Sequence, residues 1–194
     1  MSESYKIELE NIRLLWSATV EELKRLKELL EDNKFNDSFY RRLFLKSIYS
    51  AIESYLHICK KIIIFIIAYE SNSMSLDWSE LMILKEKKPY LDNKGKVKLK
   101  NEFQSFEANL RFTLNAALNV FKSNPADYGD KGFQKLILIS KKRNDITHPK
   151  DFQDFVIKKE EFTDLLAAFG WFVNLQNEIS DKFELWLKDK ISNH

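Results

Sequence analysis

The chain has 194 residues, 44% of them hydrophobic and 31% charged, which is typical of one globular domain and excludes a disordered chain. Its formal net charge of +2 excludes a polycation, so binding to a nucleic acid requires a local basic patch. The single cysteine, Cys59, excludes an internal disulfide framework and favours a reducing compartment. Four Gly and three Pro are few for this length, which favours long helices over many short strands.

The N-terminal segment and the apolar runs bear on localisation. The first ten residues, MSESYKIELE, contain no basic segment followed by an apolar core, so no signal peptide is expected. The most apolar run, residues 62–68, is too short to span a bilayer. We therefore expect a soluble, cytoplasmic protein that does not associate with membranes.

Hydrophobic residues that recur every three or four positions predict long amphipathic helices. The expected helices cover residues 4–32, 39–70, 101–123, 130–147 and 158–190. The same pattern places Leu15, Leu43 and Phe103 on the buried faces, and Asp37 or Ser38 is expected to cap the second helix. The predicted fold is all-α, an antiparallel bundle of four to five long helices that forms a single domain over residues 1–194.

Residues 71–100 interrupt this pattern. The stretch 76–81 is compatible with one short helix, and Pro89, Asn93 and Gly95 then mark turns. We expect a basic loop inserted at the surface and not a second domain.

The basic insert is a candidate RNA contact. Residues 85–100 hold seven lysines against Glu86 and Asp92. These lysines could follow an RNA backbone with help from the ring of Tyr90. The alternative is a solvated loop with no binding role.

Several common enzyme signatures are absent from the sequence. It contains no Gly-rich phosphate loop, no Gly-x-Ser-x-Gly elbow and no Cys or His cluster with the spacing of metal ligands. The three histidines are scattered at positions 57, 148 and 194. We therefore expect neither a bound metal nor a cofactor.

One segment near a predicted helix end combines the residue types needed for phosphodiester chemistry, Arg143-Asn144-Asp145-Ile146-Thr147-His148. The guanidinium of Arg143 offers a permanently charged fork of donors to a phosphate, and His148 can exchange a proton near neutral pH. Asn144 shares a helix face with His148 and can hold either partner by a hydrogen bond. Pro149 disfavours helical geometry at His148, which leaves the alternative that this histidine only caps the helix.

The motif Arg143-Asn144-x-x-x-His148 resembles that of the HEPN superfamily. It lies late in the predicted helical bundle and is followed by one more long helix, as in that superfamily. The resemblance covers roughly residues 37–70 and 101–190, of which only the motif is specific. It implies a metal-independent endoribonuclease with Arg143 and His148 as catalytic residues and Asn144 in support. The 2′-hydroxyl of RNA would attack the adjacent phosphate and leave a cyclic phosphate end.

The resemblance also implies a biological setting and partners. Members of the superfamily act in toxin–antitoxin and phage-defence systems, often as homodimers whose motifs form one composite site, so RNA, a second copy and an antitoxin or regulatory protein are the expected partners. Some toxins carry a tyrosine three residues after the histidine, which a partner nucleotidyltransferase modifies. Asp151 occupies that position here, which argues against an antitoxin of that kind.

A homodimer also follows from the chemistry. Cleavage of this type benefits from a base and an acid, but the neighbourhood of the motif offers the single histidine His148. A two-fold dimer would bring two histidines and two arginines together from one motif.

Other residues are candidates for supporting roles. Glu53 lies in the second predicted helix and could orient Arg143 through an ion pair, although a solvated or interface glutamate is the alternative. Lys141, Lys142 and Lys150 flank the motif and are expected to attract RNA phosphates. His57 and Cys59 are expected to be buried in the helical core.

Two other functions remain open from the sequence. The chain would serve as a helical interaction or scaffold module if its motif were catalytically inactive. It would serve as a regulatory nucleic-acid binder if the basic insert were its only contact with nucleic acid.

Overall fold

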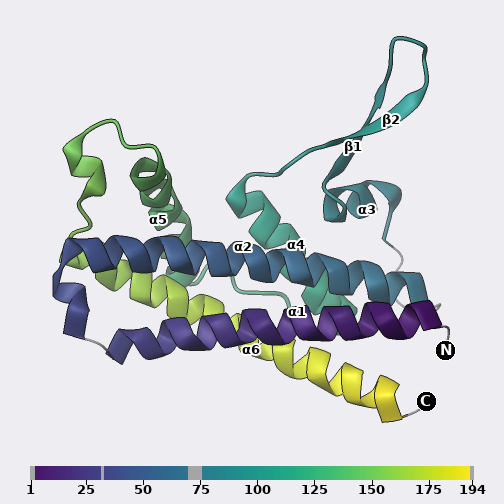
Figure 1. Cartoon of the computed structure of the whole chain (residues 1–194), viewed down its shortest axis with the longest axis horizontal. Coiled ribbons are helices and arrows are strands. Elements are labelled where there is room, and N and C mark those ends of the chain that lie inside the picture. The colour runs from purple at the N-terminus through teal and green to yellow at the C-terminus, as the bar shows by residue number, and fades with distance from the viewer. Residues whose placement is uncertain (1–2, 32, 70–75, 193–194) are drawn as a thin grey trace. The chain divides into compact units, whose positions relative to one another are not determined.

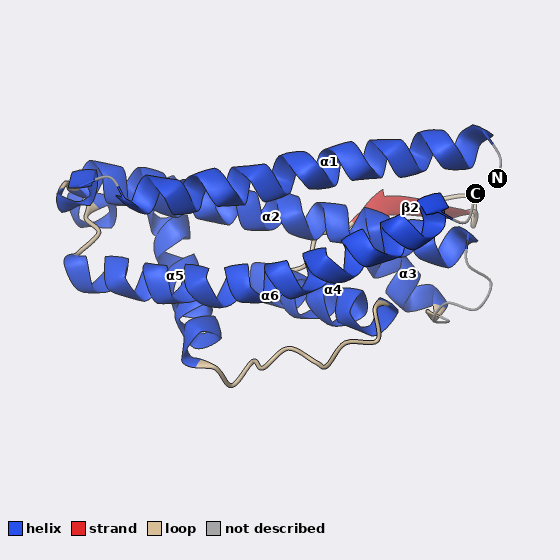
Figure 2. Ribbon diagram, turned by 90° about the horizontal axis from the view of Figure 1, so that it is seen from below, coloured by secondary structure: helices blue, strands red, loops and turns tan. Residues whose placement is uncertain are grey.

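The computed structural model describes residues 3–31, 33–69 and 76–192 (Figure 1). In chain order the elements, with η for 3₁₀ turns, are α1 (Glu3–Glu28), η1 (Leu29–Glu31), η2 (Asn33–Asn36), α2 (Ser38–Tyr69), α3 (Trp78–Leu84), β1 (Lys87–Leu91), β2 (Val97–Asn101), α4 (Phe106–Val120), α5 (Lys131–Thr147), η3 (Phe152–Phe155) and α6 (Lys159–Ser192). Over the described residues the structure is mostly helical (77%) with one small two-stranded sheet, which confirms the mostly helical fold (Figure 2). None of the helices in the described ranges combines the length and apolarity that a membrane span requires.

The contacts divide the chain into two compact units. One unit consists of Met1–Tyr55 and Ala126–His194, and the other consists of Leu56–Pro125. Helix α2 contributes its first half to the first unit and its second half to the other. The single domain over 1–194 stays a prediction.

An aromatic cluster holds the first unit together. The ring of Trp16 on α1 lies 5.2 Å from that of Tyr55 on α2 and 4.8 Å from that of Phe183 on α6. Tyr55 also meets Phe172 of α6 edge-on, with 5.5 Å between ring centroids. Helices α1, α2 and α6 therefore share one core, and aromatic pairs of this kind add about 0.5–1.5 kcal/mol each beyond the area that they bury.

Three expected core residues are exposed instead. Leu15 is 43% exposed, Leu43 50% and Phe103 73%. The buried residues of α1 follow one another at alternating four- and three-residue steps: Tyr5, Leu9, Ile12, Trp16, Thr19, Leu23 and Leu26. A stripe this narrow leaves Leu15 outside it, and Phe103 lies outside the helix because α4 begins at Phe106, with Ser105 as its N-cap.

The other unit also contains buried apolar residues. Ile62, Ile63 and Ile66 of α2 are at most 2% exposed, and Leu110 and Leu114 of α4 are fully buried. The short helix α3 begins after Asp77, whose carboxylate accepts a hydrogen bond from the N–H of Glu80 at 2.8 Å. This capping bond confirms a short helix in the region predicted for one, shifted by about two residues.

The prediction of a loop for the basic insert is wrong for residues 87–101, which form an antiparallel β-hairpin; residues 71–75 of the insert lie outside the described residues. The turn of the hairpin depends on Asp92, whose Oδ1 accepts hydrogen bonds from the N–H groups of Lys94 and Lys96 at 2.8 and 3.0 Å. Gly95 adopts φ +72° in this turn, which a residue with a Cβ rarely does. Pro89, expected in a turn, lies within β1.

Helices α5 and α6 of the first unit approach closely at Gly132. A Cβ at this position would lie 2.5 Å from Cβ of Trp171 and 3.0 Å from the carbonyl oxygen of Ala167, both on α6. Because the backbone of α6 cannot give way easily, only glycine fits here.

Replacing Gly132 by alanine is therefore expected to lower the free energy of unfolding by about 1–3 kcal/mol through overpacking. Gly170, in the middle of α6, provides the matched control, because a Cβ there meets nothing within 4 Å. Gly170→Ala is expected to raise the free energy of unfolding by up to about 1 kcal/mol, since alanine favours a helix over glycine. Urea denaturation followed by circular dichroism measures both, and equal effects would contradict the close approach.

Candidate functional site

The Arg143–His148 segment forms the C-terminal end of α5 in the first unit. The helix ends at Thr147, and His148 follows as its C-cap with φ −128° and ψ 62°, outside helical geometry. This confirms the effect expected of Pro149. The backbone N–H of His148 donates to the carbonyl oxygen of Asn144 at 2.9 Å, which fixes the residue against the last turn. The imidazole is exposed, so it is accessible to a substrate.

Two side chains orient the guanidinium of Arg143. Its Nη2 lies 2.8 Å from Oε1 of Glu53 on α2, and its Nη1 donates to Oδ1 of Asn144 at 3.2 Å. Of the two roles that the sequence left open for Glu53, the structure therefore shows the ion pair with Arg143. These contacts use two of the five N–H donors of an arginine, so the others can bind a phosphate oxygen.

The same ion pair affects the charge of the site. Side-chain exposure is 31% for Arg143 and 44% for Glu53, and ion pairs this accessible to water stabilise a fold by about 0–1 kcal/mol. The main effect of the Glu53 carboxylate is therefore to orient Arg143, and its contribution to the stability of the fold is small. It also offsets the positive charge, so a phosphate would have to bind beside the carboxylate or displace it.

Tyr49 aligns the two helices that carry this pair. It lies one helical turn before Glu53, it is 1% exposed, and its hydroxyl donates a short hydrogen bond to the carbonyl oxygen of Leu136 on α5. Burial raises the pKa of Tyr49 well above its ordinary value, although the nearby charge of Arg143 lowers it in part. The hydroxyl thus stays protonated and serves as a fixed donor between α2 and α5.

The chain forms a tight turn directly after the motif. Asp151 Oδ1 accepts from the N–H of Gln153 at 2.7 Å, and Asp154 Oδ2 accepts from the N–H groups of Lys150 and Asp151 at 2.7 and 3.2 Å. The backbone hydrogen bonds from Lys150 and Asp151 hold the pKa of Asp154 below its ordinary value. In this protein the position three residues after His148 therefore serves as a turn cap.

Two arginines at the start of α2 attach this turn to the rest of the unit. Arg41 is 8% exposed and donates to the carbonyl oxygens of Ile157 and Phe35 at 2.8 Å and of Asn36 at 2.9 Å. Arg42 donates to the carbonyl oxygen of Phe155 at 2.7 Å. The contacts with Ile157 and Phe155 span 116 and 113 positions, so nothing in the local sequence indicates them.

The three lysines that flank the motif differ in accessibility. Lys141 and Lys150 are exposed, whereas Lys142 is half-buried. Its ammonium lies 3.9 Å from the carboxylate of Glu161 and 3.4 Å from the carbonyl oxygen of Gln153. Lys142 is thus partly engaged within the protein, and the RNA-binding role of all three lysines stays a prediction.

Two expectations about helix α2 have different outcomes. Cys59 is 1% exposed and lies in the apolar core, as expected for a small hydrophobic residue. The prediction of a core histidine at His57 is wrong, because its side chain is exposed. His57 belongs to residues 56–125 and thus to the other unit.

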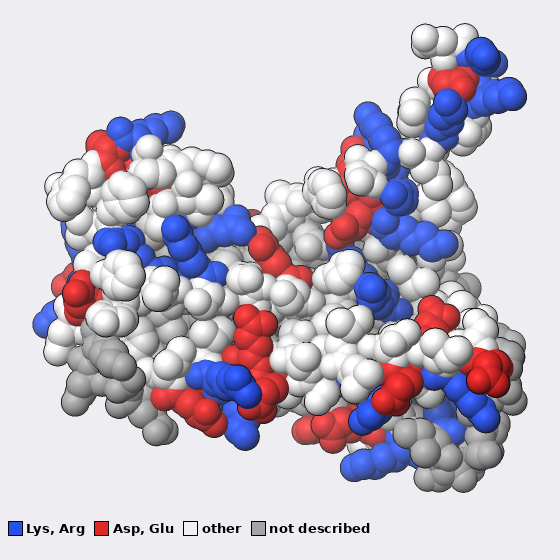
Figure 3. All heavy atoms as spheres, viewed as in Figure 1, with Lys and Arg blue, Asp and Glu red and all other residues white. Residues whose placement is uncertain are grey.

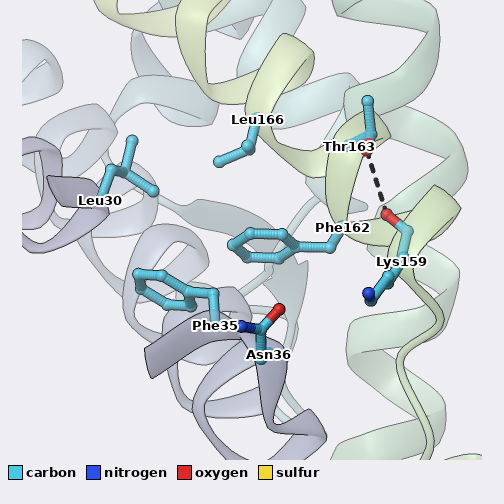
Figure 4. A pocket seen from close by; sticks show the side chains of 7 residues that line it. All are labelled: Leu30, Phe35, Asn36, Lys159, Phe162, Thr163 and Leu166. Carbon is cyan, nitrogen blue, oxygen red and sulfur yellow. Dashed lines mark hydrogen bonds between the residues drawn. The ribbon is translucent and has the colours of Figure 1, made fainter. Parts of the chain in front are cut away.

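A pocket near the start of α6 contains none of the predicted site residues (Figure 4). The rings of Phe35 and Phe162 stack there at 5.0 Å, and Leu30 and Leu166 add to its apolar wall. The hydroxyl of Thr163 donates to the carbonyl oxygen of Lys159 at 3.1 Å and is thus already satisfied. This lining offers no pair of groups for acid–base chemistry, so the candidate site is the surface around Arg143 and His148.

The arrangement supplies a cation and one exposed imidazole. Among the described residues, no three His, Cys, Asp or Glu side chains come close enough together to hold a metal ion. Comparison with models of protein families, with curated proteins and with solved structures finds no match in any of the three. The functional argument therefore depends on the residues of this chain.

Proposed function

We propose that this chain is a metal-independent endoribonuclease of the HEPN type that acts in a toxin or phage-defence setting. The observation that carries the proposal is the geometry at the end of α5. Glu53 and Asn144 hold the guanidinium of Arg143 at 2.8 and 3.2 Å, and the exposed His148 follows within the next turn. The proposal includes the antiparallel arrangement of four to five long helices that is typical of this superfamily.

The residues have complementary roles in the proposed reaction. The 2′-oxygen of a ribose forms a bond to the adjacent phosphorus, and the bond from phosphorus to the 5′-oxygen of the next nucleotide breaks. An imidazole accepts the proton of the 2′-hydroxyl, and a protonated imidazole donates a proton to the departing 5′-oxygen. The N–H donors of Arg143 stabilise the negative charge that develops on the phosphoryl oxygens. The products are a 2′,3′-cyclic phosphate and a 5′-hydroxyl end.

We further propose that the active form is a homodimer. One imidazole cannot be base and acid in the same step, and among the described residues of the first unit His148 is the single histidine. A two-fold axis near the ends of the two α5 helices would place both His148 side chains and both Arg143 side chains around one phosphate.

The test is cleavage of a mixed-sequence RNA by the purified chain in the presence of a metal chelator, with DNA of the same sequence in parallel. We expect RNA fragments with cyclic phosphate ends, intact DNA, and by light scattering a molar mass twice the 23.1 kDa of one chain. The double variant Arg143→Ala/His148→Ala, purified in the same way, measures contaminating nuclease.

Each alternative outcome has a definite meaning. Equal cleavage by the wild type and the double variant, or none by either, would refute the nuclease and leave the scaffold module. An active monomer would refute the composite site, and cleavage of DNA would exclude attack by a 2′-hydroxyl.

A further inference from the structure

The β1–β2 hairpin places three of its four strand lysines on one face and most of its apolar residues on the other. The strands pair Lys88 with Lys100 and Tyr90 with Lys98, and directly paired residues lie on the same face of a sheet. One face therefore carries three lysines and a tyrosine. Lys88 and Lys100 are exposed, as is Lys98, and Tyr90 is 42% exposed.

The opposite face of the hairpin is mostly apolar. It carries Pro89 paired with Leu99 and Leu91 paired with Val97. Leu91, Val97 and Leu99 are 68%, 70% and 52% exposed. The strands thus present two chemically different surfaces. The face with the three lysines is the one that would bind an anion.

Positive charge is concentrated in this segment. Between residues 85 and 102 seven lysines occur against Glu86, Asp92 and Glu102, an excess of four charges. The whole chain has a net charge of only +2, so the remaining residues together are net acidic. Figure 3 shows basic side chains along the hairpin. A concentration of positive charge on one hairpin, in a chain whose other charges nearly balance, favours a polyanion as its ligand.

We propose that the basic face of the hairpin binds the backbone of single-stranded RNA. Lys88, Lys98 and Lys100 contact successive phosphates, and Tyr90 stacks on a base between them. Lys88 and Lys100 lie side by side across the two strands, and Lys98 lies on the same face about 6.7 Å along β2, opposite Tyr90. The three ammonium groups and the ring therefore form one compact patch that can meet neighbouring phosphates and a base. Exposed aromatic rings stack on bases regardless of sequence, which suits a contact that recruits RNA without selecting it.

Existing ion pairs do not prevent this contact. Lys88 Nζ lies 2.8 Å from Glu102, and Lys98 Nζ lies 3.3 Å from Asp92. Both lysines are more than half exposed, whereas Asp92 is 17% exposed, and ion pairs whose ammonium is this accessible to water are weak. Phosphate groups can therefore take over these ammonium groups on binding.

The inference rests on the proposed function for its choice of RNA, but it is tested by binding and not by cleavage. The probe is a fluorescently labelled single-stranded oligouridylate longer than about 16 nucleotides, titrated with the full chain at several salt concentrations. All proteins carry His148→Ala, so that the probe stays intact. The test variant adds Lys88→Gln, Lys98→Gln and Lys100→Gln.

We expect the dissociation constant of this variant to rise at least tenfold and the slope of log K against log salt to fall by about 2, because three phosphate contacts are lost. Tyr90→Ala alone is expected to weaken binding about fivefold or more with an unchanged slope, since a stacked base is lost but no charge.

Two control variants carry the same number of changes. Leu91→Ser/Val97→Ser/Leu99→Ser alters the opposite face of the same hairpin, and Lys6→Gln/Lys24→Gln/Lys27→Gln removes three exposed lysines of α1. Both are expected to bind RNA as tightly as the parent. Circular dichroism checks that all variants fold.

Three results would overturn the inference. They are unchanged affinity in the hairpin lysine variant, an equal loss in the α1 variant, and binding to phosphatidylserine vesicles that needs the apolar face while RNA does not bind. If the wild type cleaves RNA but the lysine variant binds normally, the hairpin inference fails and the proposed function stands. If the wild type does not cleave RNA but the lysine variant loses binding, the hairpin inference stands and the proposed function fails.

Discussion

The His148→Ala protein is expected to cleave RNA at least about 100-fold more slowly than the wild type, because a positioned proton donor or acceptor contributes roughly 10²–10⁴-fold to such a reaction. The imidazole is exposed at the end of α5, and its backbone N–H, not its ring, makes the capping hydrogen bond to Asn144. Removing the ring therefore leaves the cap in place, and a loss of activity would report chemistry and not folding. Initial rates on a labelled RNA in chelator measure the effect.

The matched control is His57→Ala, which removes another exposed imidazole from α2. It is expected to keep the wild-type rate. If two imidazoles act as base and acid, the wild-type rate should also pass through a maximum with pH, and His148→Ala should lose that maximum. Equal rates for His57→Ala and His148→Ala would contradict a catalytic role for His148.

Replacing Arg41 by alanine is expected to lower the free energy of unfolding by about 3 kcal/mol. Arg41 is 8% exposed and donates to three carbonyl oxygens, those of Phe35, Asn36 and Ile157. Hydrogen bonds from a charged donor are worth about 1.5–3 kcal/mol each, and truncation would leave carbonyl groups without their partner. In a chain of this length that loss corresponds to a fall in Tm of roughly 6–12 °C.

Arg42→Ala is the comparison for this variant. Arg42 is less buried, donates to a single carbonyl oxygen, and lies over the rings of Phe39 and Phe155 at 5.7 and 5.6 Å. Its loss is expected to cost about 1 kcal/mol. Urea denaturation of both variants provides the measurement, and equal costs would mean that the buried contacts of Arg41 do not hold the turn after His148.

The hairpin shows why one part of the fold was not predictable. Four of its ten strand residues are lysines, which have low strand propensity, and the residues of both strands are mostly exposed, so no hydrophobic core reinforces an alternation. Apolar residues do alternate at positions 89, 91, 97 and 99, but over two five-residue strands this pattern is too short to predict strands where turn-forming residues indicate a loop.

The sequence by itself determined the helices and the end of α5. Apolar spacing places the long helices to within a few residues, except that α4 starts five residues late, and Pro149 ends α5 at the motif, because these effects act within a few residues of the chain. Only the tertiary structure decided what surrounds the motif. Glu53, which pairs with Arg143, lies 90 positions away, and Arg41 donates to Ile157, beyond the turn after His148, across 116 positions. The sequence offered Glu53 only as one of two alternatives and gave no indication of Arg41. Contacts over such separations depend on how helices pack, and no local pattern encodes them.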